Sequence, residues 1–294
     1  MTSSTPPAAV DIAVCMAAHN RRERTMACLA SLFAADRPAG GRLTVYLLDD
    51  GSTDGTAEAV TLAYPQVKLL RGDGACYWAG GMRRAYGAAL DGAYTHFVWL
   101  NDDVELMPDA LTRLLRHSDA LRAETGGEVI VVGAMKDHAT GATTYGGLVR
   151  YSQLRPWKLK RRDPHPDRPV PCDTVNGNLV LIPRALAQRL GNIEPQFTHA
   201  FGDIDYGYRA RRAGATLWVA PGHAGYCAPN VSRPRWKRAG LSMAQRFQMI
   251  NSPLGVPMKD QRVYAFRHFG LAGPFVFVEP YVSLAAAHFW PERS

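Results

Sequence analysis

The feature that most constrains the fold is an alternation of short apolar runs with segments of helical periodicity. Runs such as 11–18 and 95–100 have the length and apolar character of buried strands. We expect strands at 11–18, 43–48, 67–70, 95–100 and 128–135, with helices at 21–35, 52–64, 78–93 and 108–123. Repetition of this kind predicts an α/β fold: a mostly parallel sheet flanked by helices on both faces.

The loops after the expected strands are rich in glycine and polar residues. Open parallel sheets bind ligands beyond the carboxyl ends of their strands. We therefore expect four loops to converge on one crevice: 19–24, 49–54, 72–81 and 101–105. With 294 residues, 47% of them hydrophobic, the chain can bury the core of one large α/β domain or two small ones.

The second half of the chain is less regular. Residues 151–171 are basic and rich in proline, which indicates a loop or an excursion from the core. We expect strands at 174–183 and 216–220 and a helix at 202–214. The most apolar segment, 271–290, is interrupted by two prolines and Glu279, so it is a poor membrane-spanning helix. A core element and a segment against a membrane surface both remain open.

Charge and cysteine content restrict the partners and the compartment. The chain has 34 basic and 26 acidic residues, a net charge of +8, with the excess concentrated in 155–168 and 233–238. Such a surface suits a phosphorylated ligand or an anionic membrane, and no nucleic-acid recognition motif accompanies it. Five cysteines without a C-x-x-C pair indicate a reduced, cytoplasmic chain. The N-terminal stretch 1–11 does not have the features of a secretory signal.

Asp102 and Asp103 stand directly after an expected buried strand. Carboxylates in such a position cost desolvation energy unless a cation or hydrogen bonds compensate them. Mg²⁺ or Mn²⁺ prefers oxygen ligands and commonly bridges to substrate phosphates. The pair therefore favours a divalent metal site, and a cap of the following turn is the structural alternative.

Two further acidic clusters lie at other element ends. Asp49 and Asp50 have acceptor oxygens for a base N–H or ribose hydroxyls, and an Asx-type turn is the alternative. Asp203 and Asp205 begin the helix 202–214 and point in different directions. One of them can face the crevice as a general base while the other caps the helix or pairs with Arg209.

Six motifs together resemble inverting family-two glycosyltransferases with the GT-A fold, in order and spacing. They are "DIAVCMAAHNR", "LLDDGSTDGT", "YWAGGMRRAYGAAL", "WLNDDVEL", "TVNGNLVLIPR" and "FGDIDYGYRARRAG". The resemblance covers residues 11–230 and is nearest to the bacterial branch that builds surface polysaccharides, which includes rhamnosyltransferase-like members. It implies a GT-A catalytic domain at 1–230 and a basic, aromatic extension at 231–294 that packs on it.

The resemblance also implies a role for each matching position. Asp203 is the catalytic base, Asp103 is a metal ligand, and His223 is a further ligand for which His199 competes. The nucleotide-sugar contacts are Ala17, His19, Arg21, Asp49, Asp50, Trp78, Gly81, Arg84 and Asp102, with Asn176 on the acceptor side. Core packing for Trp78, a solvated helix face for Arg84 and an ordinary role for either histidine remain alternatives. The chain departs from the family pattern at Asn101, the first acid of the D-x-D element, and at Gly202, where many relatives carry Glu.

The function that this resemblance implies is metal-dependent transfer of a hexosyl or deoxyhexosyl group. The donor would be a UDP- or dTDP-sugar, the ion Mg²⁺ or Mn²⁺, and the acceptor a glycan or a lipid-linked sugar. We expect a cytoplasmic protein of polysaccharide synthesis, either free or peripheral to the inner face of the membrane. The C-terminal region would close over the donor or meet the acceptor, through Arg233, Arg235, Trp236, Arg262, Arg267 and His268.

Two other functions remain open. One is a catalytically inactive transferase relative that binds glycans, which Asn101 and Gly202 support. The other is a sugar-nucleotide nucleotidyltransferase, which usually needs a glycine-rich loop after the first strand. This chain has "AAHNRRER" there. A dehydrogenase is excluded because no G-x-G-x-x-G follows the first strand.

Overall fold

The computed structural model describes residues 9–38, 40–230 and 234–289, so Arg233 and most of the stretch 1–11 lie outside the described residues. The strands are β1 (Asp11–Ala18), β2 (Arg42–Asp49), β3 (Lys68–Arg71), β4 (His96–Leu100), β5 (Glu105–Leu106), β6 (Val129–Lys136), β7 (Thr143–Tyr145), β8 (Gly147–Arg150), β9 (Leu159–Arg162), β10 (Val170–Pro171), β11 (Leu179–Pro183) and β12 (Thr216–Tyr226). The α-helices are α1 (Arg22–Ala34), α2 (Thr56–Ala63), α3 (Tyr77–Leu90), α4 (Ala110–Thr125), α5 (Arg184–Leu190), α6 (Gly202–Arg212), α7 (Met243–Ile250), α8 (Met258–His268) and α9 (Gly273–Phe289).

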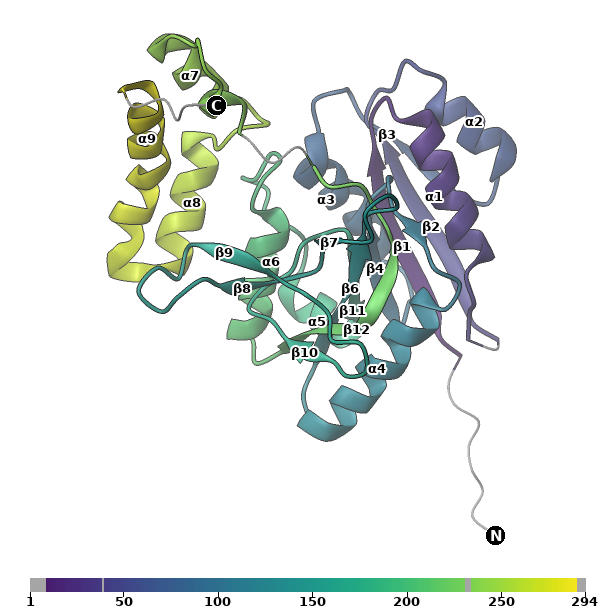
Figure 1. Ribbon diagram of the computed structural model, residues 1–294. Coiled ribbons are helices and arrows are strands. Elements are labelled where there is room, and N and C mark those ends of the chain that lie inside the picture. Colours follow the sequence, from purple (N-terminus) through teal and green to yellow (C-terminus); the bar gives the residue numbers. More distant parts are fainter. Residues whose placement is uncertain (1–8, 39, 231–233, 290–294) are drawn as a thin grey trace.

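A mixed, mostly parallel sheet forms the centre of the molecule, as the sequence predicts (Figure 1). Its strand order is β10-β12-β6-β11-β4-β1-β2-β3, with β5 paired to β12 and β7 to β6. β1 is parallel to both β2 and β4, whereas β11 runs antiparallel between β4 and β6. The chain continues from β1 to β2 on one side and returns to β4 on the other. The gap beyond β1 and β4 is therefore the topological switch point, where such sheets bind ligands.

Helices cover both faces of the sheet. Alternate residues of β1 explain why the run 11–18 is apolar throughout: Ala13 and Cys15 pack into one core, and Ile12, Val14 and Met16 into the other. The first core includes residues of α3, α5 and α6, and the second includes residues of α1, α2 and α4. Because β1 is buried on both faces, its sequence does not show the alternation of apolar and polar residues that is typical of a half-exposed strand.

Three expected segments of the second half differ from the structure. Within 174–183 only Leu179–Pro183 is a strand, because residue 174 forms a single bridge to Leu148 and the chain then bends past the α3 helix. The excursion 151–171 contains strand β9, which pairs antiparallel with β8 in a separate two-stranded sheet. The strand expected at 216–220 continues to Tyr226. Its pairing register with β6 is irregular between Val219 and His223, and Pro221 and Gly222 in this stretch are the residues that suggested the end of the strand.

The C-terminal segment forms a short 3₁₀ turn (Arg235–Lys237), α7, α8, a second 3₁₀ turn (Gly270–Ala272) and α9. Figure 1 shows these helices on the side of the molecule away from α1 and α2. The proline at position 280 does not break the helix of this apolar segment, since α9 is continuous through Pro280. Proline removes the N–H that would bond the carbonyl four residues earlier. Here the buried Gln261 side chain of α8 donates to that carbonyl, on Val276, at 2.6 Å.

The segment Gly270–Phe289 is the one described helical stretch that is long and apolar enough to cross a membrane. Its mean hydropathy is 1.3, and 17% of it is buried within the protein. Leu271, Phe275 and Val282 are largely exposed on it. Length and composition alone are weak evidence for a membrane span, so the exposed apolar surface is the firmer observation.

Close packing of α3 on the sheet gives the first prediction. A Cβ added at Gly81 would lie 2.8 Å from the Ala17 Cβ and 3.1 Å from a Leu48 methyl. We expect Gly81→Val to lower the free energy of unfolding by about 1–3 kcal/mol through overpacking. Gly127→Val is the control, since its nearest neighbour would be the Gly214 carbonyl at 3.8 Å. Urea denaturation measures both, and equal effects would contradict the proposed packing role.

Candidate functional site

A cavity of about 400 Å³ lies beyond the carboxyl ends of β1 and β4, at the switch point of the sheet. It is lined by Ala17, Ala18, His19, Arg21, Asp50, Gly74, Tyr77, Trp78, Asn101, Asp102, Asp103, Tyr145, His199, Asn230 and Leu254. All four loops that the sequence assigned to one crevice contribute to this lining. The predicted convergence is therefore present, and it brings together six of the predicted nucleotide-sugar contacts and Asp103.

Asp102 and Asp103 share one arginine. Nη1 of Arg21 donates to Asp102 Oδ1 at 3.2 Å and to Asp103 Oδ2 at 3.0 Å, and Arg24 lies 4.0 Å from Asp103. Burial raises the pKa of Asp102 to about 6, and the charge of Asp103 adds to this rise while Arg21 opposes it. Two adjacent carboxylates with one close counter-charge form a strongly negative point in the cavity, which suits a hard divalent cation.

Asn101, the departure from the D-x-D pattern, holds the cavity wall. Its Oδ1 accepts a hydrogen bond from Trp78 Nε1 at 2.7 Å, and its Nδ2 donates to Asn178 Oδ1 at 3.1 Å. An amide can accept and donate at once, whereas an ionised aspartate can only accept. The Asn side chain therefore joins the indole to the β11 end of the sheet, a role that an aspartate would not fill.

Two glycines, Gly177 and Gly202, leave room for the close packing in and beside the Trp78 wall. A Cβ on Gly177 would be 2.2 Å from the indole Cζ2. A Cβ on Gly202 would be 3.1 Å from the Ala79 Cβ and from a methyl of Ile193. A side chain as large as glutamate does not fit at 202 unless these neighbours move. The second departure from the family pattern is thus explained by close packing next to the cavity.

Asp50 lines the cavity and also anchors its edge. Its two carboxylate oxygens accept from the backbone N–H groups of Gly74 and Cys76, both at 2.9 Å, and of Tyr77 at 3.1 Å. This fixes the loop that enters α3, including Tyr77 at a φ of 52°. Asp49 is fully buried, pairs with Arg71 at 3.0 Å and does not line the cavity.

Asp50, Asp73 and Cys76 form a group whose possible metal-ligand atoms lie within 4.8 Å of one another. Backbone amides already occupy much of this group, since Asp50 accepts three of them and Asp73 accepts the N–H of Ala75. A thiol is also a soft ligand that Mg²⁺ and Mn²⁺ do not favour. The oxygen-only pair of Asp102 and Asp103 fits these ions better.

Asp203 lies in the first turn of α6 and outside the cavity lining. Its oxygens accept from the N–H of Gly177 at 2.9 Å and of Ile204 at 2.8 Å. Burial raises the pKa of Asp203, and these amide hydrogen bonds partly oppose the rise. A carboxylate with a raised pKa is a stronger proton acceptor than a solvated one.

Asp205 has a structural role, as the expectation of two different directions predicted. It pairs with Arg209 at 2.8 Å, Arg267 at 3.0 Å and His268 at 2.8 Å. Burial alone would raise the pKa of Asp205, but the bonds to His268 and Arg209 outweigh it and lower that pKa. Arg267 and His268 therefore brace α6 in place of closing over the cavity.

Four other predicted residues lie outside the cavity lining. Gly81 packs on Ala17, and Arg84 donates to the carbonyl of Arg71 at 2.6 Å. Asn176 has a buried side-chain oxygen that is without a partner among the described residues. The His223 ring lies 2.9 Å from the Thr143 hydroxyl. Its competitor His199 does line the cavity, where it accepts from the backbone N–H of Trp78 at 3.4 Å.

Tyr145, Asn230 and Leu254 line the cavity without having been predicted. The Tyr145 hydroxyl accepts from the N–H of Asn230 at 2.9 Å, and burial raises the pKa of Tyr145 to about 12. These residues come from β7, the segment after β12 and the loop after α7. Only long-range packing brings them to the cavity, so no local pattern in the sequence could have identified them.

Comparison with known proteins agrees with this geometry. The profile of Glycosyl transferase family 2 matches residues 13–179. No curated protein matches the chain. A mannosyltransferase, PcManGT from Pyrobaculum calidifontis, solved with GDP-Man and Mn²⁺, is 18% identical at a TM-score of 0.51, over 96% of this chain and 76% of that one. GalNAc-T7, solved with UDP, GalNAc and Mn²⁺, is 16% identical at a TM-score of 0.55, over 93% of this chain and 55% of that one. Likeness at these identities shows the shared fold.

The raised pKa of Asp102 predicts a pH-dependent stability. Because the folded pKa of about 6 exceeds the ordinary value of 3.8, the carboxylate lowers stability above pH 6, and the cost disappears as pH falls toward 4. With EDTA present, Asp102→Asn should raise the free energy of unfolding at pH 8 by at most about 3 kcal/mol, and by much less at pH 4.5. Thermal unfolding at both pH values measures this, with the exposed Asp119→Asn as control. A gain of equal size at both pH values would contradict it.

Proposed function

The chain belongs to glycosyl transferase family 2, and we propose that it transfers a sugar from a nucleotide-diphosphate donor to an acceptor hydroxyl with inversion. The observation that carries this proposal is one cavity at the switch point, which unites Asp50, Arg21 and the Asp102–Asp103 pair; Asp203 is joined to its Trp78 wall through Gly177. The transferred group is a hexose or deoxyhexose, and the acceptor is a glycan or a lipid-linked sugar.

The donor occupies the cavity with its nucleoside toward β1 and β2. Ala17, His19 and Asp50 line that end, and the His19 ring bonds the Asp50 carbonyl. Trp78, held by Asn101, offers a flat apolar face for the sugar ring. We propose a UDP- or dTDP-sugar as donor, with its base near Asp50, where Gly74, His19 and Tyr77 also line the cavity.

Asp103 and Asp102 would hold Mg²⁺ or Mn²⁺, and the oxygen donors and shared counter-charge of this pair fit such an ion. When bound, the ion supplies positive charge for a leaving diphosphate. His199 lines the cavity and is a candidate further ligand, whereas the other lining histidine, His19, bonds the Asp50 carbonyl; His223 stays a prediction. Both similar solved structures contain Mn²⁺, which supports a divalent ion here.

Asp203 acts as the base in this proposal. The acceptor oxygen forms a bond to the anomeric carbon while its proton moves to the Asp203 carboxylate. The bond from that carbon to the diphosphate oxygen breaks, and the diphosphate leaves with the electron pair. Arg21 and Arg24 supply fixed positive charge near the site where this charge develops. The attraction between these arginines and the developing negative charge is stronger in buried surroundings than in water.

An inactive glycan-binding relative is the second candidate, since Asn101 and Gly202 depart from the family pattern. Both residues have packing roles around Trp78, so neither departure argues for lost activity by itself. A role in bacterial surface polysaccharide synthesis, in a rhamnosyltransferase-like branch, belongs to the same proposal, as does a cytoplasmic location with contact to the inner face of the membrane.

Replacement of the base tests the mechanism. Asp203→Asn removes the proton acceptor and keeps the side chain's shape, so turnover should fall by at least about 10²-fold. The binding constant of the donor should change little. In the unmodified protein, kcat should rise with pH through the raised pKa of Asp203. Steady-state kinetics with Asp119→Asn as control measure this, and near-normal turnover in Asp203→Asn would refute the assignment.

Replacement of a metal ligand tests the cavity. Asp103→Ala should abolish the part of donor affinity that depends on Mn²⁺, by about tenfold or more, because it removes one of two adjacent oxygen ligands. Isothermal titration with UDP and dTDP, with Mn²⁺ and with EDTA, gives that part directly. Asp73→Ala is the matched control from the other acidic group. If Asp73→Ala, and not Asp103→Ala, loses the Mn²⁺ effect, the metal lies in that other group.

A further inference from the structure

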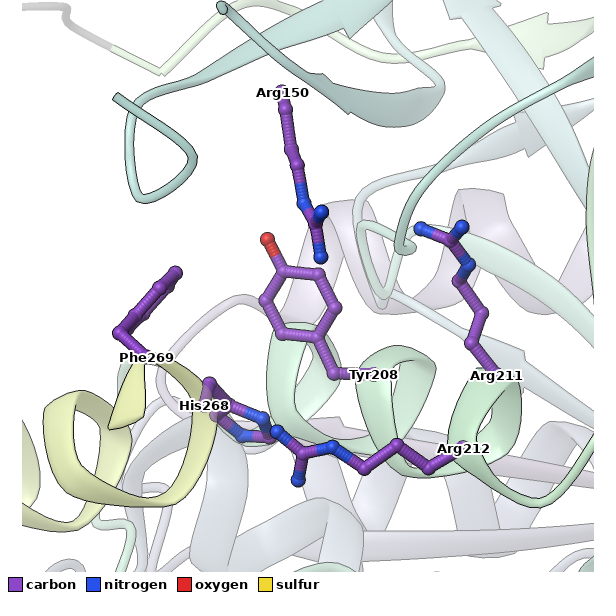
Figure 2. Close-up of a pocket in the computed structure, with 6 residues that line it drawn as sticks. All are labelled: Arg150, Tyr208, Arg211, Arg212, His268 and Phe269. Atoms are coloured by element: carbon purple, nitrogen blue, oxygen red, sulfur yellow. The ribbon is translucent and has the colours of Figure 1, made fainter. Parts of the chain in front are cut away.

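A second pocket, of about 210 Å³, lies at the C-terminal end of α6 (Figure 2). It is lined by Arg150, Tyr208, Arg211, Arg212, His268 and Phe269. None of these residues lines the cavity at the switch point. The pocket is therefore a separate site, formed by β8, α6 and the end of α8, and neither the family pattern nor the proposed transfer reaction gives it a role.

The lining is strongly basic. Arg211 is neutralised by an ion pair with Asp173, whereas Arg150 and Arg212 have no carboxylate partner among the described residues. Figure 2 shows Arg150 pointing from β8 toward Tyr208, with its guanidinium 5.7 Å from the ring centre. Arg212 donates to the carbonyl of Arg267 and reaches past His268. Two guanidinium groups without a carboxylate partner among the described residues thus line the pocket, Arg150 beside the Tyr208 ring and Arg212 beside His268.

Two buried polar side chains in this pocket have atoms without partners. The His268 side chain is 1% exposed, and its Nε2 lies 2.8 Å from Asp205, but its Nδ1 makes no hydrogen bond within the described chain. Tyr208 is 5% exposed, and its hydroxyl is likewise unpartnered. An unpaired buried polar group costs free energy, and a ligand with acceptor oxygens would satisfy the Tyr208 hydroxyl directly and His268 Nδ1 once the ring is protonated.

We propose that this pocket binds a phosphate group, as a phosphomonoester or a diphosphate. Arg150 and Arg212 offer forked N–H donors of the kind that bind phosphate oxygens. The Tyr208 hydroxyl offers a further donor from the buried side, and Nδ1 of His268 does so when its ring is protonated. Donors that approach from β8, from α6 and from the end of α8 suit a tetrahedral group with oxygens in several directions better than a planar carboxylate. This site does not depend on the proposed catalytic reaction.

The phosphate has two possible sources with the same chemistry. One is a free phosphate or diphosphate. The other is a phosphate that carries a hydrocarbon chain, which the apolar surface beside the pocket favours: Phe269 lines the pocket, and Leu271 and Phe275 follow it with exposed side chains. Asp203 stands eight residues before Arg211 on α6, roughly 12 Å along the helix axis. A lipid-linked acceptor could span that distance.

His268 connects phosphate binding to pH. Because Asp205 accepts a proton from Nε2, Nδ1 of the neutral ring is an acceptor and needs a proton before it can donate to an anion. Burial lowers the pKa of His268, Asp205 opposes this, and Arg212 and Arg267 add to the lowering. Tyr208, Tyr264 and Arg150 are the other titratable or charged groups near it. Binding of an anion should therefore take up a proton and tighten as pH falls.

Isothermal titration with inorganic phosphate and diphosphate, in EDTA, tests the pocket directly. The double variant Arg150→Gln/Arg212→Gln should bind at least about tenfold more weakly, since it loses two charge-assisted contacts. Arg116→Gln, an exposed arginine of α4, is the control and should change affinity less than about twofold. If all variants bind alike, the phosphate is held elsewhere and the proposal is overturned.

Vesicles separate the two sources. Sedimentation compares phosphatidylcholine vesicles with those containing phosphatidic acid, a phosphomonoester, or phosphatidylserine, which has no terminal phosphate. Binding to phosphatidic acid alone, lost in the double variant, supports a lipid-borne phosphate, and binding of free phosphate alone supports the soluble source. Equal binding to both anionic lipids, or no binding of any phosphate probe, contradicts a phosphate-specific pocket.

The pH arm uses sulfate, whose charge is constant between pH 6 and pH 8. Wild-type affinity for sulfate should be higher at pH 6, and His268→Gln should remove most of this dependence while the protein still binds. A pH-independent affinity in the wild-type protein would exclude His268 as a donor to the anion. The arginine variants remain an independent measure of the pocket itself.

Discussion

The buried carboxylate of Asp50 determines how the rest of the site is arranged. By accepting three backbone N–H groups, it ties the end of β2 to the start of α3. Trp78 is thereby placed where Asn101 can hold its indole and where Gly177 and Gly202 leave space for the ring. Gly177 in turn donates to Asp203. The three acidic stretches of the sequence are thus linked through the Trp78 side chain. A change in the loop that enters α3 would therefore alter the positions of the aspartates in all three stretches.

The aspartates differ in how completely nearby cations compensate their negative charge. This difference distinguishes the structural Asp205 from the proposed metal ligands Asp102 and Asp103. Asp205 has three cationic or imidazole partners and a lowered pKa, so it has little capacity to bind anything further. Asp102 and Asp103 share Arg21, and Asp102 keeps a raised pKa. The protein keeps two incompletely neutralised carboxylates together at a stability cost. Binding of a cation would remove that cost, as expected of the proposed metal site.

The sequence predicted the parts of the fold whose signal is local. β1 and β4 are apolar on both faces, and their following loops carry the polar residues that meet at the switch point. The Asp50 contacts, the burial of Asp49 and the entry of Tyr145 depend on distances between segments far apart in the chain, which no single stretch encodes. Gly81 shows the limit most clearly. Its motif suggested a ligand contact, but the absence of a side chain serves helix packing on Ala17.

The C-terminal segment holds the helix of the proposed base in place, because it supplies two of the three partners of Asp205. Arg267 and His268 come from α8, and without them a fully buried carboxylate of α6 would keep only Arg209. An uncompensated buried charge of this kind destabilises a protein by several kcal/mol. The helix that carries Asp203 at one end and the basic pocket at the other would then lose its position. The position of the proposed base, Asp203, therefore depends on residues on both sides of residue 230.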